Sequence, residues 1–352
     1  MSVEAEAQPT QILPGDDPAA IAHAAELLRA GGLVAFPTET VYGLGADALD
    51  PLAVQAIFAA KDRPADNPLI VHVADVAAAR ALAREFPPLA ERAAEALWPG
   101  PLTIVLRRAA IVPDATTAGH DTVALRVPGH PVALALLAAC GRPLAAPSAN
   151  RSGRPSPTTA QHVLADLGGR VALILDGGPT DHGLESTVLD LSHARPLLLR
   201  RGALTHEQLE ALLGPIDCID ADAASPPPGE PDPEQEARAR ALAAARARSP
   251  GLRHRHYATR ARVELVPEGE GESAAARALA AGERVGLVCR RAVNSPASVR
   301  RLPEALEGFA QALFATLRGL DDDQVDRIVV ESVPEVGLGA TIMDRLRRAA
   351  AG

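Results

Sequence analysis

The sequence predicts an α/β protein of two domains joined by a proline-rich segment, and three observations lead to this prediction. Short apolar runs alternate with helical patterns along most of the 352 residues. The stretch 225–233, SPPPGEPDP, cannot pack into a core and interrupts that alternation. A chain of this length can bury two separate cores. We therefore expect a domain with a twisted mixed sheet at 12–215, a linker at 216–261 and a small doubly wound domain at 262–352.

Capping residues mark the helices of the first domain. Asp17 and Asp50 each precede a proline, which predicts an N-cap followed by proline at the first helical position. Gly31 and Gly32 end the first helix, and the second runs to Ala60. The other helices expected here are one from Asp75 to about Arg84, one ending at Trp98, Pro131–Cys140, Thr158–Leu167, and one capped by Thr205 with Gln208 at the capping-box position.

Short apolar or alternating runs predict the strands between these helices. They are Leu33–Phe36, Asn67–Val73, Leu102–Arg107, Thr122–Val127, Leu144–Pro147, Val171–Leu175, Thr187–Leu191 and Pro196–Arg201. The hydroxyl-rich and glycine-rich segment 37–45 is expected to be a loop. An Ala/Arg-rich stretch after the prolines favours a helix. In the second domain, strands at Val263–Val266, Val285–Cys289 and Arg327–Val330 alternate with helices at Ser273–Ala281, Glu304–Leu317 and Ala340–Ala350.

The overall charge excludes some classes of function. The net charge is −9 and the pI is about 5.6, which disfavours a non-specific nucleic-acid binder but not a local nucleotide site.

The acidic start of the chain lacks the pattern of a signal peptide, and apolar runs such as Val132–Cys140 are too short to span a membrane. The three cysteines form no Cys-x-x-Cys pair, so we expect a cytoplasmic protein without a structural zinc site or a membrane partner.

Lys61 is the only lysine in the chain, and it precedes Arg63 by two residues at the end of a predicted helix. A lysine is a compact, mobile charge and an arginine is a rigid planar fork, so the pair suits a chain of phosphates. The alternative is a solvated helix end whose cations face the C-terminal dipole.

Tyrosine and asparagine, two residue types that are rare in this chain, lie mostly in segments that are expected to be polar loops. Both tyrosines, Tyr42 and Tyr257, and two of the asparagines, Asn67 and Asn150, lie there. Functional sites are commonly built from loops on a rigid scaffold, so this distribution favours a binding site. The single tryptophan, Trp98, lies in Trp-Pro-Gly-Pro and is expected to be a packing anchor.

Three arginines end or interrupt apolar strands. Arg126 lies in an otherwise apolar strand, and either an internal acid or a ligand carboxylate must pair with it. Arg200 and Arg201 raise the same question. Ser148 and Asn150 follow another strand, where they could donate to phosphate oxygens or form an Asx-type turn.

A dinucleotide site is disfavoured. The segment Gly43–Ala48 matches the loose fingerprint G-x-G-x-x-A, which requires a strand, a tight turn and then a helix. Here a loop separates the preceding strand from the glycines, and the next helix begins only after Asp50. The sequence also lacks the G-x-x-x-x-G-K-[ST] pattern of a P-loop.

Several of these segments together resemble a known family. In chain order, PTETVYGLGADA, KDRPADNPLIVH, WPGPLT, TVALRVP, APSANRSGRPSPT, ESTVLD and LLRRGA are similar to the YrdC-like threonylcarbamoyl-adenylate synthases. SPGLRHRHYAT, followed by an α/β domain ending in GLGATIMDRLRRAA, resembles the long two-domain form. The resemblance covers nearly the whole chain apart from its first residues and the proline-rich linker.

The resemblance implies that the N-terminal domain has a YrdC-like fold. It also implies that the protein is an L-threonylcarbamoyladenylate synthase, which is a nucleotidyltransferase. Such an enzyme joins L-threonine, bicarbonate and ATP and releases pyrophosphate. Mg²⁺ would arrive with ATP rather than be held by protein side chains. Downstream threonylcarbamoyl-transferase proteins would use the product to modify adenosine in tRNA, so tRNA would be reached indirectly.

The resemblance also implies the site residues. The expected catalytic residues are Lys61 and Arg63. ATP-binding roles fall on Lys61, Arg63, Asn67, Thr122, Ser148, Asn150, Ser156, Arg200, His256 and Tyr257. L-Threonine-binding roles fall on Thr40, His72, Arg126, Ala146 and Ser186. His256 and Tyr257 belong to a linker segment that folds over the site, in which His254 and Thr259 depart from the pattern of the family.

Two other classes of function follow from the residues. A nucleic-acid-binding module could use the same basic cleft for an RNA backbone, and it would show salt-dependent RNA affinity without threonine-dependent consumption of ATP. A dinucleotide-dependent enzyme using Gly43 and Gly45 would bind a nicotinamide cofactor.

Overall fold

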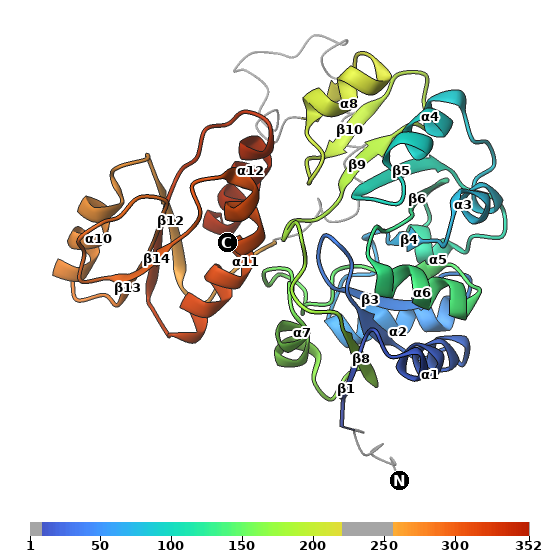
Figure 1. Cartoon of the computed structure of the whole chain (residues 1–352), viewed down its shortest axis with the longest axis horizontal. Helices are drawn as coiled ribbons and strands as arrows, with labels where there is room; N and C mark the ends of the chain where they lie inside the picture. Colours follow the sequence, from blue (N-terminus) through green and yellow to red (C-terminus); the bar gives the residue numbers. More distant parts are fainter. Residues whose placement is uncertain (1–8, 220–255, 352) are drawn as a thin grey trace.

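The computed structural model describes residues 9–219 and 256–351. The proline-rich stretch, the expected Ala/Arg-rich helix and most of the expected linker lie outside these ranges. Figure 1 shows two units side by side, one built from the chain up to β11 and the other from the chain after residue 256.

A mixed sheet runs through the first unit. Among the described residues its eleven strands follow the order β1-β8-β2-β3-β7-β4-β6-β5-β9-β10-β11, with parallel and antiparallel neighbours, which confirms the predicted mixed sheet. The strands are β1 (Gln11–Pro14), β2 (Val34–Phe36), β3 (Gly43–Asp47), β4 (Ile70–His72), β5 (Leu102–Arg107), β6 (Thr122–Arg126), β7 (Leu144–Ala145), β8 (Leu173–Asp176), β9 (Thr187–Asp190), β10 (Leu197–Arg200) and β11 (Asp217–Cys218).

Side-chain caps start several of the helices as the sequence predicts. The carboxylates of Asp17, Asp50 and Asp75 accept hydrogen bonds from the first-turn amides of α1, α2 and α3, and Thr205 and Gln208 form the predicted capping box of α8. The helices of this unit are α1 (Pro18–Arg29), α2 (Pro51–Lys61), α3 (Val76–Leu82), α4 (Pro88–Leu97), α5 (Asp114–Thr117), α6 (Pro131–Cys140), α7 (Ala160–Leu167) and α8 (His206–Leu213).

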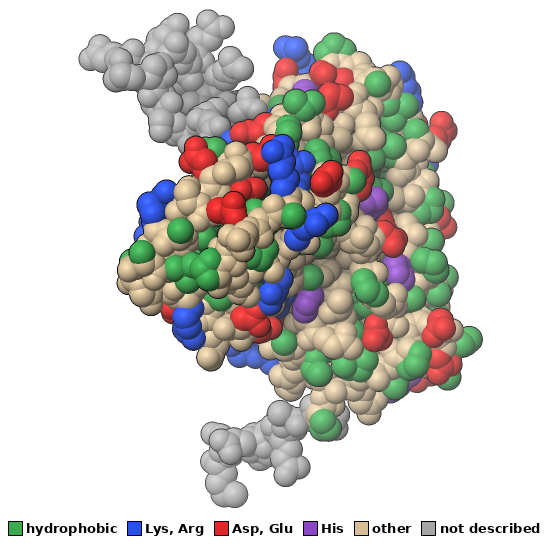
Figure 2. Space-filling model, turned by 60° about the vertical axis from the view of Figure 1, so that its left-hand side comes forward, with side chains coloured by type: hydrophobic (Ala, Val, Ile, Leu, Met, Phe, Trp, Pro, Cys, Tyr) green, Lys and Arg blue, Asp and Glu red, His purple; other side chains and the backbone are tan. Residues whose placement is uncertain are grey.

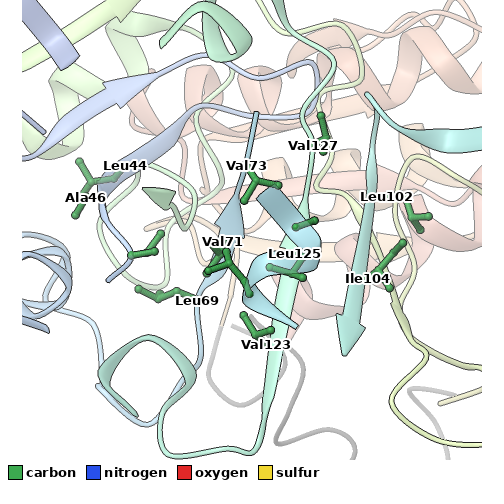
Figure 3. Packing of buried hydrophobic residues seen from close by; sticks show 14 of the residues in the cluster. Leu44, Ala46, Leu69, Val71, Val73, Leu102, Ile104, Val123, Leu125 and Val127 are labelled. Atoms are coloured by element: carbon green, nitrogen blue, oxygen red, sulfur yellow. The ribbon is translucent and has the colours of Figure 1, made fainter. Parts of the chain in front are cut away.

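Strands β4 and β6 connect the core to the site. They are parallel neighbours, with Val71 opposite Leu125 and His72 opposite Arg126. Val71 and Leu125 point into the main apolar core (Figure 3). Because side chains alternate between the two faces of a strand, His72 and Arg126 project to the opposite face. The apolar core therefore fixes the position of two polar side chains.

One predicted loop is wrong in part. The structure forms β3 at Gly43–Asp47, within and beyond the segment expected to be irregular, and pairs it antiparallel with β2. Gly45 is needed there because a Cβ atom at this position would lie 2.8 Å from the Phe36 ring. The glycines thus serve close packing between strands rather than a turn. Short elements without a strong pattern, β1, β11 and α5, also escaped prediction.

The second unit is a small doubly wound domain, as expected. Its strands β12 (Arg262–Val266), β13 (Val285–Cys289), β14 (Ser298–Arg301) and β15 (Arg327–Glu331) are parallel in the order β12-β15-β13-β14. Helix α10 (Gly271–Ala280) packs with Leu287 and Val329. Helices α11 (Leu306–Asp322) and α12 (Leu338–Ala350) pack with Val288 and Ile328, which lie on the opposite face.

Helices α11 and α12 face the first unit, and α10 lies on the far side (Figure 1). The junction is tight, because a Cβ atom at Gly183 would lie 2.5 Å from the Gln311 backbone. Gln311 donates to the carbonyl of Thr180 at 3.1 Å, and Leu184 is buried in the apolar cluster of the second unit. No helix within the described ranges combines the length and the apolar run needed to cross a membrane.

Candidate active site

A cavity lies on the polar face of the central strands, between their ends and the segment that enters the second unit. All five residues expected to bind L-threonine line it: Thr40, His72, Arg126, Ala146 and Ser186. Of the residues expected to bind ATP, seven line it: Arg63, Ser148, Asn150, Ser156, Arg200, His256 and Tyr257. The structure therefore brings most of the two predicted sets together in one space.

Arg126 has an acidic partner that the sequence did not identify. Its Nη2 atom lies 2.7 Å from Oε1 of Glu39, and both side chains are buried. Its Nε atom donates to the carbonyl of Gly100 at 3.2 Å. Burial alone would raise the pKa of Glu39, but Arg126 outweighs burial and the pKa lies below its ordinary value. Of the two pairings left open for Arg126, the internal one is present in this structure.

The ion pair leaves capacity for a ligand. Arg126 Nη2 carries two hydrogens, and within the described residues its only polar contact is the one with Glu39 Oε1. His72 is adjacent across the strand pair, and its Nδ1 atom is also without a hydrogen-bond partner in the part of the chain that the structure describes. Burial, and then the charge of Arg126, lowers the pKa of His72 to about 3, so its imidazole is neutral at pH 7.

Ser186 joins the two predicted halves of the site. Its hydroxyl lies 2.7 Å from that of Thr103, and its carbonyl accepts a hydrogen bond from Arg200 Nη2 at 2.9 Å. The same Arg200 nitrogen also donates to the Ser186 hydroxyl at 3.1 Å. Burial lowers the pKa of Arg200 to about 10 against the opposing effect of Glu185, so Arg200 remains a cation at neutral pH.

Arg63 supplies a second cation to the wall. Asp62 caps the C-terminal end of helix α2 in the left-handed conformation with φ 52°, and the next residue, Arg63, lines the cavity. Arg63 Nη2 makes long contacts of 3.5 Å to the carbonyls of Asn67 and Pro68, and within the described residues its Nε has no hydrogen-bond partner. Burial, and then the charge of Arg200, lowers the pKa of Arg63 to about 10.

Lys61 lies beneath the cavity rather than in its wall. Its side chain is 1% exposed, and its ammonium donates to the carbonyl of Ser148 at 2.5 Å and to that of Asn150. Burial, and then Arg63, places its pKa well below the ordinary value. In this structure Lys61 holds the loop that carries Ser148 and Asn150, and its contact with phosphates stays a prediction.

The loop after β7 is also held by its own side chains. The Ser148 hydroxyl donates to Asn150 Oδ1 at 2.5 Å, and Asn150 Nδ2 donates to the carbonyls of Arg151 and Arg154 at 2.7 and 2.9 Å. These contacts differ from the Asx-type turn offered as the alternative, in which the side-chain oxygen would accept from a backbone N–H, and both residues line the cavity. The Ala146 amide donates to the carbonyl of Ile70 at 2.9 Å, so its N–H is committed to the sheet.

Besides Lys61, two residues expected to bind ATP lie outside the wall. Asn67 is buried and contributes its carbonyl to Arg63. Thr122 is buried at the start of β6, paired with Arg107. It precedes Arg126 by four residues, or about 13 Å along an extended strand, so it lies away from the cavity.

Glu185 is a second acidic residue that the sequence reasoning missed. It lines the cavity, and its Oε1 atom accepts a hydrogen bond from the Ser156 hydroxyl at 2.6 Å. Glu185 is the first residue of the motif ESTVLD, and that motif is the signal that could have identified it. Glu39 likewise lies within the PTET segment of another motif.

His256 and Tyr257 close one side of the cavity. Their rings are tilted with centroids 5.7 Å apart, and Tyr257 stacks on Phe314 of α11 at 5.0 Å. Burial, and then Arg63, lowers the pKa of His256 to about 3. The backbone at Tyr257 has φ 63°, a left-handed conformation that is uncommon for residues other than glycine.

The charged and polar side chains at the surface and in the cavity wall indicate what kind of ligand the cavity can bind. Acidic and basic side chains are intermixed over the face drawn in Figure 2. Within the described residues there is no group of three or more His, Cys, Asp or Glu side chains that could hold a metal ion. The wall instead combines buried arginines with hydroxyl groups, a set that suits an anionic ligand.

Two family models match consecutive parts of this chain. Residues 26–202 match the family model of Sua5, YciO and YrdC, described as "Telomere recombination". Residues 204–351 match the model described as "Threonylcarbamoyl-AMP synthase, C-terminal domain".

Full-length relatives and a solved structure extend these matches. The chain is 44% identical over 332 residues to a threonylcarbamoyl-AMP synthase of Pyrococcus abyssi, covering 93% of this chain and 92% of the relative. It is 44% identical over 347 residues to one of Bacillus subtilis, covering 97% and 96%. The crystal structure of P. abyssi Sua5 complexed with L-threonine superposes with a TM-score of 0.88 at 42% identity, covering 97% of this chain and 98% of that one.

Proposed function

The chain belongs to the threonylcarbamoyl-AMP synthase family, and we propose that it condenses L-threonine, bicarbonate and ATP into threonylcarbamoyl-AMP and pyrophosphate. The observation that carries this proposal is the single cavity that unites Arg126 and His72 with Arg63 and Arg200. An amino acid and a nucleotide could meet there with their reacting groups adjacent.

Arg126 is suited to a threonine carboxylate. A guanidinium offers two parallel N–H donors to a carboxylate, and the Nη2 atom keeps hydrogen-bonding capacity beside Glu39. The hydroxyls of Thr40 and Ser186 line the same part of the cavity and can meet the polar groups of the amino acid. A relative solved with L-threonine, P. abyssi Sua5, supports this choice of amino acid.

The chemistry requires two successive attacks. The free amine of threonine attacks the carbon of bicarbonate, and loss of water leaves a carbamate. A carbamate oxygen then attacks the α-phosphorus of ATP in line, and the bond to pyrophosphate breaks. The imidazole of His72 is neutral, so one of its ring nitrogens can accept a hydrogen bond from the amine.

The buried arginines serve the phosphate step. Arg63 and Arg200 stay cationic at neutral pH and can offset negative charge on the departing pyrophosphate. A Mg²⁺ ion carried by ATP would neutralise further charge on the phosphates. Little covalent work falls to the protein, so positioning and charge neutralisation dominate. Lys61 acts by holding Ser148 and Asn150 in the wall.

The intermediates need protection from water. A carbamate loses CO₂, and the mixed anhydride of threonylcarbamoyl-AMP hydrolyses. His256, which is partly buried, and Tyr257, which is buried, cover one side of the cavity, and this supports a role in excluding water. As a nucleotidyltransferase, the protein would pass its product to threonylcarbamoyl-transferase proteins that modify tRNA.

Product identification tests the proposal. The protein is incubated with Mg-ATP, L-threonine and ¹³C-bicarbonate, and the products are analysed by mass spectrometry. We expect a nucleotide that contains AMP, one threonine and one labelled carbon. Conversion of ATP to AMP and pyrophosphate without any labelled, threonine-containing nucleotide would contradict the proposed reaction.

A further inference from the structure

The second unit buries an arginine completely at its junction with the first. Arg345 of α12 is 1% exposed and is the first of the largest fully buried side chains by volume. A buried guanidinium is costly unless it is paired and hydrogen-bonded, so the partners of Arg345 should explain its presence.

Among the described residues, two of the four partners of Arg345 belong to the first unit. Arg345 Nε donates to Oε2 of Glu185 at 2.9 Å, and Nη2 donates to the carbonyl of Arg201 at 2.7 Å. Nη1 pairs with the neighbouring Asp344. The guanidinium carbon also lies 5.6 Å from the centre of the Tyr257 ring, within the range of a cation–π contact.

Two of these partners are themselves part of the cavity wall. Glu185 uses one oxygen for Arg345 and the other for the Ser156 hydroxyl, and Glu185, Ser156 and Tyr257 all line the cavity. Arg345 does not line it. Burial alone would raise the pKa of Glu185, but Arg345, followed by Arg200, brings it down to about 2. The carboxylate in the wall is therefore ionised.

An ionised carboxylate would repel the phosphates of a nucleotide unless its charge were neutralised. We propose that Arg345 is a positioning residue through which the C-terminal domain sets the nucleotide half of the site. It neutralises Glu185, directs that carboxylate to Ser156 and supports the ring of Tyr257. This inference rests on the proposed function, because it assigns ATP to this half of the cavity.

A matched control separates this role from simple docking of the two units. Thr341 lies one helical turn before Arg345 on α12, is buried, and donates to the carbonyl of Gly202 at 3.0 Å. Neither Thr341 nor Gly202 lines the cavity. Thr341→Val removes a hydrogen bond of the same interface while keeping the shape of the side chain.

The test compares Arg345→Met with Thr341→Val in threonine-dependent pyrophosphate release. Arg345→Met should raise the KM for ATP about tenfold or more, because Glu185 loses its charged partner, and change the KM for L-threonine less than about twofold. Adding Glu185→Gln to Arg345→Met should recover part of the loss, because a neutral amide needs no cation. Arg345→Lys should fall between wild type and Arg345→Met.

The inference is overturned if Arg345→Met leaves the KM for ATP at the wild-type value, or raises both KM values equally. It is also overturned if Thr341→Val reproduces the same pattern. If Arg345→Met does not fold, Arg345→Lys and the double variant decide in the same way. Calorimetric titration with Mg-ATP alone tests Arg345 even if the wild type makes no pyrophosphate, so failure of the proposed function is distinguishable from failure of this inference.

Discussion

Arg126 and Glu39 form a buried ion pair, with 2.7 Å between Nη2 and Oε1, at the part of the cavity assigned to an amino acid. The carboxylate holds the guanidinium in place. A ligand carboxylate would then share the guanidinium with Glu39, using the donor capacity that the ion pair leaves.

Replacement of Arg126 should weaken threonine binding selectively. In Arg126→Met, we expect the KM for L-threonine to rise by about 10- to 100-fold, since a charge-assisted hydrogen bond contributes about 1.5–3 kcal/mol. The KM for ATP should change far less. Steady-state pyrophosphate release at varied concentrations of each substrate measures both constants.

Loss of Arg126 also leaves Glu39 buried without its partner, which can destabilise the fold. The double variant Arg126→Met/Glu39→Gln removes both charges and controls for this effect. It should regain stability in a thermal melt but not threonine affinity. Equal increases in the two KM values would show that Arg126 is structural.

Replacement of Lys61 should abolish turnover through the loop it holds. Lys61→Met leaves the buried carbonyls of Ser148 and Asn150 without the ammonium, so we expect loss of ATP-to-pyrophosphate turnover and about 1–3 kcal/mol of stability. Denaturant unfolding and pyrophosphate release measure the two effects.

Arg151→Gln is the matched control for Lys61. Arg151 lies in the same loop but pairs on the surface with Asp62, where an ion pair contributes little. This control should keep wild-type turnover within about twofold. Near-normal turnover in Lys61→Met would remove Lys61 from the site.

Stability should fall in mild acid because of buried histidines. Burial, and then Arg126, lowers the pKa of His72 in the folded protein to about 3, whereas an unfolded histidine titrates near about 6.5. Below that value the unfolded chain binds a proton that the folded protein does not. This contribution to stability is present above about pH 6.5 and is lost at up to about 1.4 kcal/mol per unit as the pH falls toward 3.

Urea unfolding at several pH values between 7 and 5 checks this dependence. In His72→Gln, the dependence of the unfolding free energy on pH should be shallower than in wild type. His23→Gln, on the exposed face of α1, should keep the wild-type dependence. An identical pH dependence in His72→Gln and wild type would show that His72 is not the source.

The sequence predicted the elements with strong local signals. The caps at Asp17, Asp50 and Asp75 and the capping box at Thr205 all appear in the structure, because these contacts form within a few residues. The strand β3 was missed because its glycines resemble those of a turn. Glycine is needed there because of close contact with Phe36, and this contact arises only when β2 and β3 pair. The strand β14 was missed because Ser298–Arg301 is short, polar and partly exposed.

In the candidate site too, local motifs were predicted from the sequence, whereas contacts between distant segments were not. The motifs identified the residues that line the cavity, and the rarity of lysine drew attention to position 61. They could not show that Lys61 lies beneath the wall, or that Glu39 and Glu185 neutralise arginines, because those contacts join segments far apart in the chain. The contribution of Arg345 was also hidden, since it depends on how the two units meet.

The central claim is that one cavity couples an amino acid to the cleavage of ATP. The most direct measurement is pyrophosphate release from Mg-ATP and bicarbonate by the wild-type protein, with and without L-threonine. We predict release that depends on L-threonine and is not supported by L-alanine at the same concentration. Equal release with and without L-threonine, or no release under either condition, would contradict the account.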